Sequence, residues 1–519
     1  MKKILALVMI IMILVLGLSI EREVSSFQEE NKYNGYINYN MVSNPDNLKQ
    51  TNNVNVREKD LLANLFEGLV KENESGVIEG ALAKSFNVSE DGLEYEFILR
   101  EDIYYSSGEK ILPDDFVSFF KSFLEDEENI YRSDLDCIYG AKDFREGKND
   151  FSKVAIRAKD NSVVIRLNYP CPYLLNILAN PIYTLRDYNE LEQYKNNYKG
   201  IRFTGPFIIN EAFKEYIIIT KNSKYYDHKD IYESPIRISF IESSESALAV
   251  LEEENNNVNS KVDLMLDVPV NEIYRLNKLK LIESFDGDTL INIRFNVDNG
   301  KIFNDIEARR FISNLINRDN ICKSISSKLL KPAYTTTPAL EEVYEKTDSQ
   351  NHDIDKSYFD KITTEDKLQI SVLYEENSLQ RRLAKEFCKY LYKETGVEFI
   401  PKGYSRAELE KLKESKEYDI FLEAFKFQYD YEKEYYEYIL TFFQDDSSLI
   451  KDIINDIRFK VNKQERINEL YKCEEILKNE KLIIPLYKVN NVVCRKENIK
   501  GIYVTNFGNI ILSKLKISL

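Results

Sequence analysis

The chain has 519 residues, of which 43% are hydrophobic, and a formal net charge of −16 at pH 7. A chain this long exceeds what one hydrophobic core serves, so we expect two or three domains. Such an acidic surface repels nucleic-acid phosphates, and Lys and Arg are spread without a basic stripe. Nucleic acid is therefore excluded as a partner.

The first twenty residues have the layout of an export signal. Lys2 and Lys3 precede an apolar run over 4–20, and the first acid is Glu21. The exit has no small-x-small cleavage site, and no cysteine lies near it for lipid modification. As a helix the run is about 25 Å long, short for a bilayer core of roughly 30 Å. We expect a location outside the cytoplasmic membrane, and we favour residues 1–20 as an uncleaved anchor over a cleaved signal.

The sequence carries no signature of catalysis or metal binding. His228 and His352 are far apart and have no partners at ligand spacing. The six cysteines are scattered without a C-x-x-C pair, which predicts buried free thiols, although disulfides stay open for an exported chain. We find no G-x-S-x-G, G-x-x-x-x-G-K-[ST], H-E-x-x-H or G-x-G-x-x-G motif. We therefore assign no catalytic residue, metal or cofactor, and we expect a protein that is not an enzyme.

The first half of the chain is rich in strands. Leu93, Tyr95, Phe97 and Leu99 alternate with polar residues after an Asp-Gly turn, which predicts a half-buried strand. The same reasoning predicts further strands at 36–40, 163–167, 207–209, 216–220, 236–240 and 262–266, and helices at 57–70 and 244–251.

The second half alternates strands with helices. Capping boxes, Asn304 with Glu307 and Ser405 with Glu408, open two helices, and Gly396 ends a third that spans 379–391. A late helix is predicted at 467–477. Strands are predicted at 290–296, 368–374, 397–400, 418–425 and 483–487. This alternation predicts a largely parallel sheet flanked by helices. Exported α/β chains without catalytic motifs are often proteins that enclose a ligand between two lobes.

Several local patterns occur in a family-specific order. The stretch 65–70 reads L-F-E-G-L-V, and 80–100 reads G-A-L-A-K-S-F-N-V-S-E-D-G-L-E-Y-E-F-I-L-R. Further along come T-G-P-F at 204–207 and I-P-L-Y at 484–487. Together these patterns resemble the solute-binding proteins of peptide and nickel ABC importers, solute-binding protein family 5. Most of the matched residues have structural explanations, so they identify a fold and do not mark a ligand site.

The resemblance implies an α/β, two-lobed fold of the periplasmic-binding-protein type II-like kind, with an additional β-rich subdomain and a hinge cleft. After the signal or anchor segment 1–20 and a linker 21–35, lobe I is expected at 36–56, 172–265 and 490–519. The extra lobe is expected at 57–171 and lobe II at 266–489.

The resemblance also suggests where a ligand would bind. Family members place acids in a W-x-x-D-Y-x-D-P region; here 425–432 reads F-K-F-Q-Y-D-Y-E, and Gln428 stands where the first acid would be. Asp430 is then a candidate partner for a peptide ammonium group, the alternative being a solvated loop acid. Because the chain has no Trp, Phe425, Phe427 and Tyr429 are candidate pocket walls, although some of these aromatics could simply pack the core. Tyr131 is a further candidate ligand contact.

Three functions are compared on this basis. The first, implied by the resemblance, is a monomeric extracytoplasmic protein that captures peptides and delivers them to ABC permease subunits in the membrane. The alternative is a membrane-tethered peptide receptor or sensor on the same fold, which the missing lipid-anchoring cysteine and the altered acid region favour. A secreted hydrolase would need a nucleophile and base that we do not find.

Overall fold

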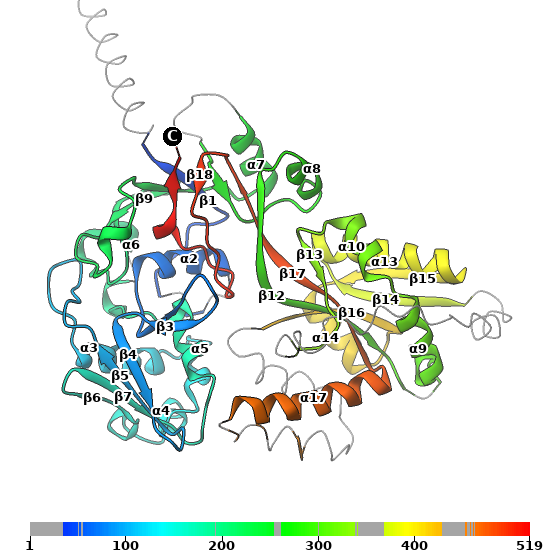
Figure 1. Cartoon of the computed structure of the whole chain (residues 1–519), viewed down its shortest axis with the longest axis horizontal. Helices are drawn as coiled ribbons and strands as arrows, with labels where there is room; N and C mark the ends of the chain where they lie inside the picture. Colours follow the sequence, from blue (N-terminus) through cyan, green and yellow to red (C-terminus); the bar gives the residue numbers. More distant parts are fainter. Residues whose placement is uncertain are drawn as a thin grey trace, which may run out of the picture.

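The computed structural model describes most of the chain beyond residue 34 (Figure 1). The described residues are 35–518 except 50, 53–54, 192–193, 254–260, 299, 338–339, 341–367, 428–451, 454–456, 458–459 and 461. Within them, two α/β lobes lie side by side and are linked by long strands. We call them lobe I and lobe II. A small β-sheet, which belongs to the extra lobe, lies below lobe I in this view.

Lobe I is built on five strands of a large sheet. The order is β11 (Leu264–Met265), β1 (Ile37–Met41), β10 (Ile236–Phe240), β9 (Tyr216–Lys221) and β8 (Phe207–Ala212). β1 is parallel to both of its neighbours, and all five of its residues are buried. Helix α2 (Val56–Leu65) and the C-terminal residues 499–518 complete this lobe, so it joins segments from both ends of the described chain.

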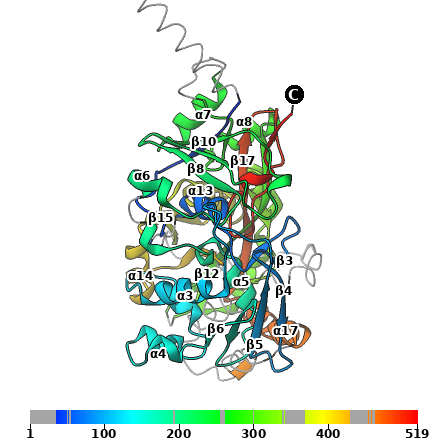
Figure 2. The same ribbon diagram turned by 90° about the vertical axis from the view of Figure 1, so that its left-hand side faces the viewer.

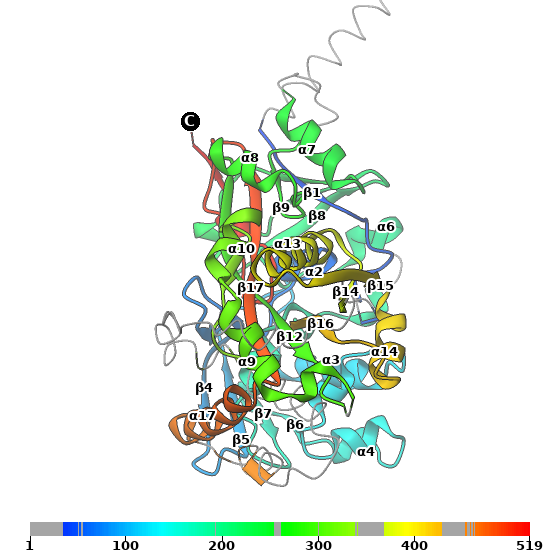
Figure 3. The same ribbon diagram turned by 90° about the vertical axis from the view of Figure 1, so that its right-hand side faces the viewer.

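Lobe II holds the alternating part of the chain. β15 (Glu398–Tyr404), β14 (Gln369–Glu375) and β16 (Ile420–Lys426) are neighbours and run parallel. They are joined by α13 (Ser378–Thr395) and α14 (Arg406–Glu414). α13 buries a stripe at helical spacing and ends at Gly396, whose φ of 74° is the left-handed geometry that favours glycine. α9 (Ile306–Leu315), α10 (Arg318–Ile325) and α13 lie on the outer side of the lobe (Figure 3).

Two long strands connect the lobes. β12 (Ile282–Phe295) and β17 (Ile483–Arg495) pair with each other antiparallel over most of their length. At one end β17 pairs with β11 of lobe I, and at the other end β12 pairs with β16 of lobe II. The large sheet therefore runs through both lobes without interruption, and the β12–β17 ladder is the hinge between them.

The extra lobe has a four-stranded antiparallel sheet. Its order is β4 (Ala83–Val88), β5 (Glu94–Leu99), β7 (Ser162–Arg166) and β6 (Ile156–Lys159), and α3 (Pro113–Glu125) packs against it. In β5 every second residue is buried, as the alternation predicts. The sheet lies beneath the strands of lobe I in two perpendicular views (Figure 2), and its core is continuous with that of lobe I.

The remaining helices and strands are short apart from one helix. They are β2 (Val70–Glu72), β3 (Ile78–Gly80), β13 (Leu330–Pro332), β18 (Ile499–Lys500), β19 (Lys516–Ile517), α4 (Ala141–Arg145), α5 (Leu174–Ala179), α6 (Tyr194–Asn197), α7 (Ser244–Glu252), α8 (Ile273–Lys278) and α17 (Lys463–Glu480).

Three expectations about local structure are wrong. The helix expected at 57–70 ends at Leu65, because Phe66 is extended and β2 follows four residues later. Asn304 does not cap α9; Asp305 is the N-cap and accepts from the backbone N–H of Glu307. The large sheet is mixed, because β12, β17 and β8–β10 add antiparallel pairs to the parallel ones.

Other expectations are confirmed. Ser405 and Glu408 form the predicted capping box at α14. All six cysteines are buried and free. The expected domain boundaries stay a prediction, and the apolar run 4–20 lies outside the described residues. Among the helices of the described chain, none is both long and apolar enough to cross a membrane.

A register shift in the β12–β17 ladder allows a test of how tightly its two strands pack. Between Phe285 and Thr289 the register of β12 shifts against β17. Gly287 lies in this shift, where an added Cβ would overlap the carbonyl oxygen of Val489. We expect G287A to lower the free energy of unfolding by about 2 kcal/mol, because backbone on both strands must move.

Denaturant unfolding followed by circular dichroism measures this change. G35A is the matched control, since a Cβ there meets no atom within 4 Å, and it should leave the unfolding midpoint unchanged. Equal midpoints for both variants would show that the hinge tolerates a side chain at this position.

Candidate functional site

Helix α2 lies at the centre of lobe I, and its first turn is fixed by side-chain contacts. The Asn55 side chain caps the helix by accepting from the backbone N–H of Arg57 at 3.0 Å. Three residues later, Asp60 is only 1% exposed. A carboxylate that deep requires several donors, because burying an uncompensated charge is costly.

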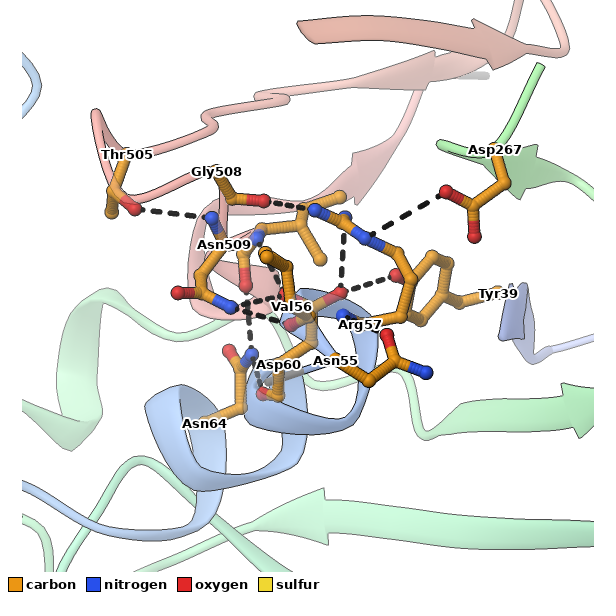
Figure 4. Close-up of polar contacts among 11 residues, drawn as sticks. Tyr39, Asn55, Val56, Arg57, Asp60, Asn64, Asp267, Thr505, Gly508 and Asn509 are labelled. Carbon is orange, nitrogen blue, oxygen red and sulfur yellow. Dashed lines mark hydrogen bonds and ion pairs between the residues drawn. The ribbon is translucent and has the colours of Figure 1, made fainter. Parts of the chain in front are cut away.

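Asp60 receives four donors from three separate segments (Figure 4). Its Oδ2 accepts from the Tyr39 hydroxyl at 2.5 Å and from Arg57 Nη1 at 3.2 Å. Its Oδ1 accepts from Asn509 Nδ2 at 2.8 Å and from the backbone N–H of Ile510 at 3.2 Å. Burial raises the pKa of Asp60 to about 6, although Arg57 and these donors oppose that rise. The carboxylate thus holds β1, α2 and the C-terminal segment together.

Arg57 extends this network toward the hinge. It donates to the carbonyl oxygen of Gly508 and lies 4.0 Å from a carboxylate oxygen of Asp267, just after β11 (Figure 4). One turn later, the Asn64 side chain donates to the Ile510 carbonyl at 2.8 Å and accepts from the Leu512 backbone N–H at 2.7 Å. The C-terminal segment therefore lies along α2 and is held there by side-chain hydrogen bonds from the helix.

Lys59 lies next to this network in the sequence, but its ammonium group takes no part in the network's hydrogen bonds. Its residue is 8% exposed, and its Nζ lies 4.5 Å from the centre of the Tyr131 ring. Burial and, to a smaller extent, Lys426 lower the pKa of Lys59 to about 8, whereas Asp134 and Asp288 oppose the shift. Lys426 and Asp288 belong to β16 and β12, so the ammonium group lies within electrostatic reach of the strands that lead into lobe II.

Where β12 and β16 pair, they carry an acidic residue, Asp288, and a basic residue, Lys426. Asp288, whose side chain is 11% exposed, lies 3.5 Å from Nζ of Lys426 and accepts from the Thr289 hydroxyl at 3.3 Å. Burial raises the pKa of Asp288, and Lys426 opposes this. The carbonyl of Asp288 also accepts from the backbone N–H of Phe427 at 2.8 Å, which ties the two strands together beyond their ladder.

The structure places three of the five predicted site residues. Phe425 and Phe427 pack edge-on with ring centres 4.8 Å apart, and Phe427 is buried with Leu290 and Ala333. Tyr131 is 3% exposed and lies under Lys59. Tyr429 and Asp430 fall outside the described residues. The structure thus places Tyr131 against Lys59, and the ligand contacts of all five residues stay a prediction.

Sequence reasoning missed Lys59 and Asp288. The sequence alone gives no role to Arg57, Glu58, Lys59 and Asp60, yet all four are buried. Asp288 precedes the expected strand at 290–296, whereas β12 begins at Ile282. The only usable signal was a run of four charged residues beside an apolar helical face.

A separate cavity of about 360 Å³ lies in lobe I, between the β2–β3 hairpin and the C-terminal segment. Two buried acids in its wall have partners of their own. Glu67 accepts from the Tyr225 hydroxyl at 2.5 Å, and Glu72 accepts from the Tyr503 hydroxyl at 3.0 Å. Among the described residues, no group of three potential metal ligands occurs in this cavity or elsewhere.

The Asp60 network gives a test of stability. We expect D60N to lower the free energy of unfolding by about 3 kcal/mol, because the variant leaves the Arg57 guanidinium buried without its closest anion. Thermal and denaturant unfolding measure the change. D46N is the control, since the Asp46 side chain is fully exposed and its contact with Lys195 is a surface ion pair. A D60N protein as stable as D46N would show that the network is dispensable.

Comparisons with known proteins agree on one family. A model described as "Bacterial extracellular solute-binding proteins, family 5 Middle" matches residues 77–446, more than half of the chain. The oligopeptide-binding protein OppA of Bacillus subtilis is 23% identical over 486 residues, which cover 86% of each chain. The solved structure of MppA, a periplasmic murein tripeptide-binding protein in an unliganded open form, matches with a TM-score of 0.76 at 17% identity, covering 93% of this chain and 97% of that one.

A second solved structure has the same fold. OppA of Haemophilus influenzae, in complex with the peptide RPPGFSPFR, matches with a TM-score of 0.66 at 18% identity and covers 93% of this chain and 99% of that one. With two lobes, a hinge ladder and a family model that spans the extra lobe and most of lobe II, the chain belongs to the bacterial extracellular solute-binding proteins of family 5.

Proposed function

We propose that this chain captures peptides between its two lobes outside the cytoplasmic membrane and delivers them to an ABC importer. As a member of its family it is a solute-binding protein and not an enzyme. The names of its relatives support peptides as the ligand class, since they include oligopeptide- and dipeptide-binding proteins.

The observation that carries the proposal is the meeting of two lobes at one hinge. The β12–β17 ladder joins the lobes, and buried charged groups from α2 on one side and from β12 and β16 on the other come within electrostatic reach. A rotation at the hinge can enclose a ligand between such faces without breaking either core. An extended peptide also offers backbone N–H and C=O groups that protein backbone can pair, whatever its side chains are.

We further propose the predicted residues as parts of the peptide site. Tyr131, Phe425 and Phe427 would supply aromatic walls, with Tyr429 and Asp430 beside them in the chain. The proximity of Tyr131 to Lys59 supports its placement near the ligand. The apolar run 4–20 supports export of the chain, with residues 1–20 kept as an anchor or removed, and we propose that it acts as a monomer.

Native mass spectrometry tests peptide capture directly. We expect the full-length chain, purified in mild detergent without denaturation, to carry peptides that mild acid releases. The N-termini of these peptides will show whether an acid such as Asp430 receives a free ammonium group. An empty protein that also shows no thermal shift with a mixed peptide library contradicts the proposal.

A membrane-tethered peptide receptor is the second candidate function. The absence of a cysteine near the exit of the apolar run supports it, and one solved structure of the same fold is titled as a pheromone receptor, PrgZ. Uptake of a labelled peptide by cells separates the two functions. Deleting the gene for this chain should stop uptake if the chain feeds an importer, and should leave uptake unchanged if it is a receptor.

A further inference from the structure

Lys59 stands apart from the other buried charges of lobe I. Arg57 has Asp60 and a backbone carbonyl as partners, and Asp60 has four donors. The Lys59 ammonium, by contrast, has neither an ion pair nor a hydrogen bond with any residue that the structure describes. Its residue is nevertheless 8% exposed, although a buried ammonium group is costly unless it is paired.

Among the described residues, no acid lies within ion-pair distance of the Lys59 ammonium group. The Tyr131 ring attracts the cation through its face but carries no negative charge. Asp134 accepts from the Tyr183 hydroxyl at 3.0 Å, and Asp288 is paired with Lys426 at 3.5 Å. Each of the two acids thus has another partner; both still favour the charged form of Lys59 at longer range, whereas Lys426 disfavours it.

The position of Lys59 is also fixed. It lies between Arg57 and Asp60 on α2, and the Asp60 and Asn64 contacts hold that helix against the C-terminal segment. The contacts of Asp60 and Asn64 therefore fix the backbone from which the Lys59 side chain extends. A donor on a fixed backbone, placed over an aromatic ring, suits recognition of an anion, because less further ordering is needed on binding.

We propose that Lys59, seated over Tyr131, receives a carboxylate group of the bound ligand. The inference rests on the proposed function and deepens it, because it names the ligands as peptides with an acidic side chain or a free C-terminus at this point. An ammonium group bonded to a carboxylate makes a charge-assisted hydrogen bond, and in a water-poor site such a bond is strong.

The pairing predicts a pH dependence. The groups that face Lys59 are Lys426 on β16, Asp288 on β12, and Tyr131 and Asp134 beside the extra lobe. With a pKa of about 8 in the free protein, Lys59 loses its proton as the pH rises through that value. A bound carboxylate favours the charged form and so raises that pKa in the complex. Affinity for an acidic ligand should therefore fall about tenfold from pH 7 to pH 9, and affinity for a neutral ligand should not change.

Matched peptide pools test the proposal on the full-length chain. The pools are pentapeptides with Glu or Gln at one position and with a free or an amidated C-terminus, and uptake is measured by native mass spectrometry. We expect wild type to prefer one acidic form over its neutral counterpart by about tenfold. A preference for Glu over Gln indicates a side-chain carboxylate, and a preference for the free over the amidated end indicates the C-terminus.

Two variants and one control locate the preference. K59Q and K59M should lose it at pH 7 and should show no fall in affinity between pH 7 and pH 9. K84Q, at an exposed lysine of β4, should behave like wild type. K59M without ligand should melt at the same temperature as wild type or about 1–3 °C higher, because it removes a buried charge that has no ion-pair partner.

The outcomes separate this inference from the proposed function. If wild type binds no pool, both fail. If it binds the pools without an acidic preference, or if K59Q keeps the preference, the inference fails and peptide capture stands. Lower melting temperatures for both Lys59 variants would show a structural role for the ammonium group and would also overturn the inference.

Discussion

The buried carboxylate of Asp60 is the contact on which the arrangement of lobe I depends. It takes donors from β1, from α2 and from the C-terminal segment, so it joins parts of the chain that are 450 positions apart. The C-terminal segment has few regular hydrogen bonds of its own, because β18 and β19 are only two residues long each. Its place along α2 rests on polar contacts to Asp60 and Asn64 and on the burial of Ile510 and Leu512 in the core of lobe I. The polar contacts in turn fix the helix that carries Lys59.

The second constraint is the hinge. β12 and β17 are shared by both lobes, so any relative motion of the lobes must bend this ladder. Its register shifts between Phe285 and Thr289, and such an irregularity disrupts the ladder and bends the strand locally. Asp288 lies within that shift and Lys426 pairs with it. We expect a bend at this point to change the separation between Lys59 and the Asp288–Lys426 pair, and so to link the electrostatics between the lobes to their closure.

Local patterns predicted local structure well and long-range structure poorly. The alternation in 93–99 and the capping box at Ser405 are confirmed because neighbouring residues alone decide them. The length of the β12–β17 ladder could not be seen, since residues such as Ile282 and Cys494 pair across 212 positions with no local signal. Lys59 was missed for a related reason. Its burial depends on elements far along the chain, whereas its neighbours in sequence are charged and give no local sign of burial.

Lys59 is informative about function because it differs from the other buried charges of lobe I in its partners. Lobe I contains several buried acids and bases, and Arg57, Asp60, Glu67 and Glu72 each have partners from the chain itself. Such groups are accounted for by folding. The Lys59 ammonium group is also buried, lies over the Tyr131 ring and has no ion pair within the described chain, so it is not accounted for in this way. Its electrostatic cost in the free protein becomes a gain when an anion arrives, and a peptide-binding protein has a natural anion in the carboxylate of its ligand.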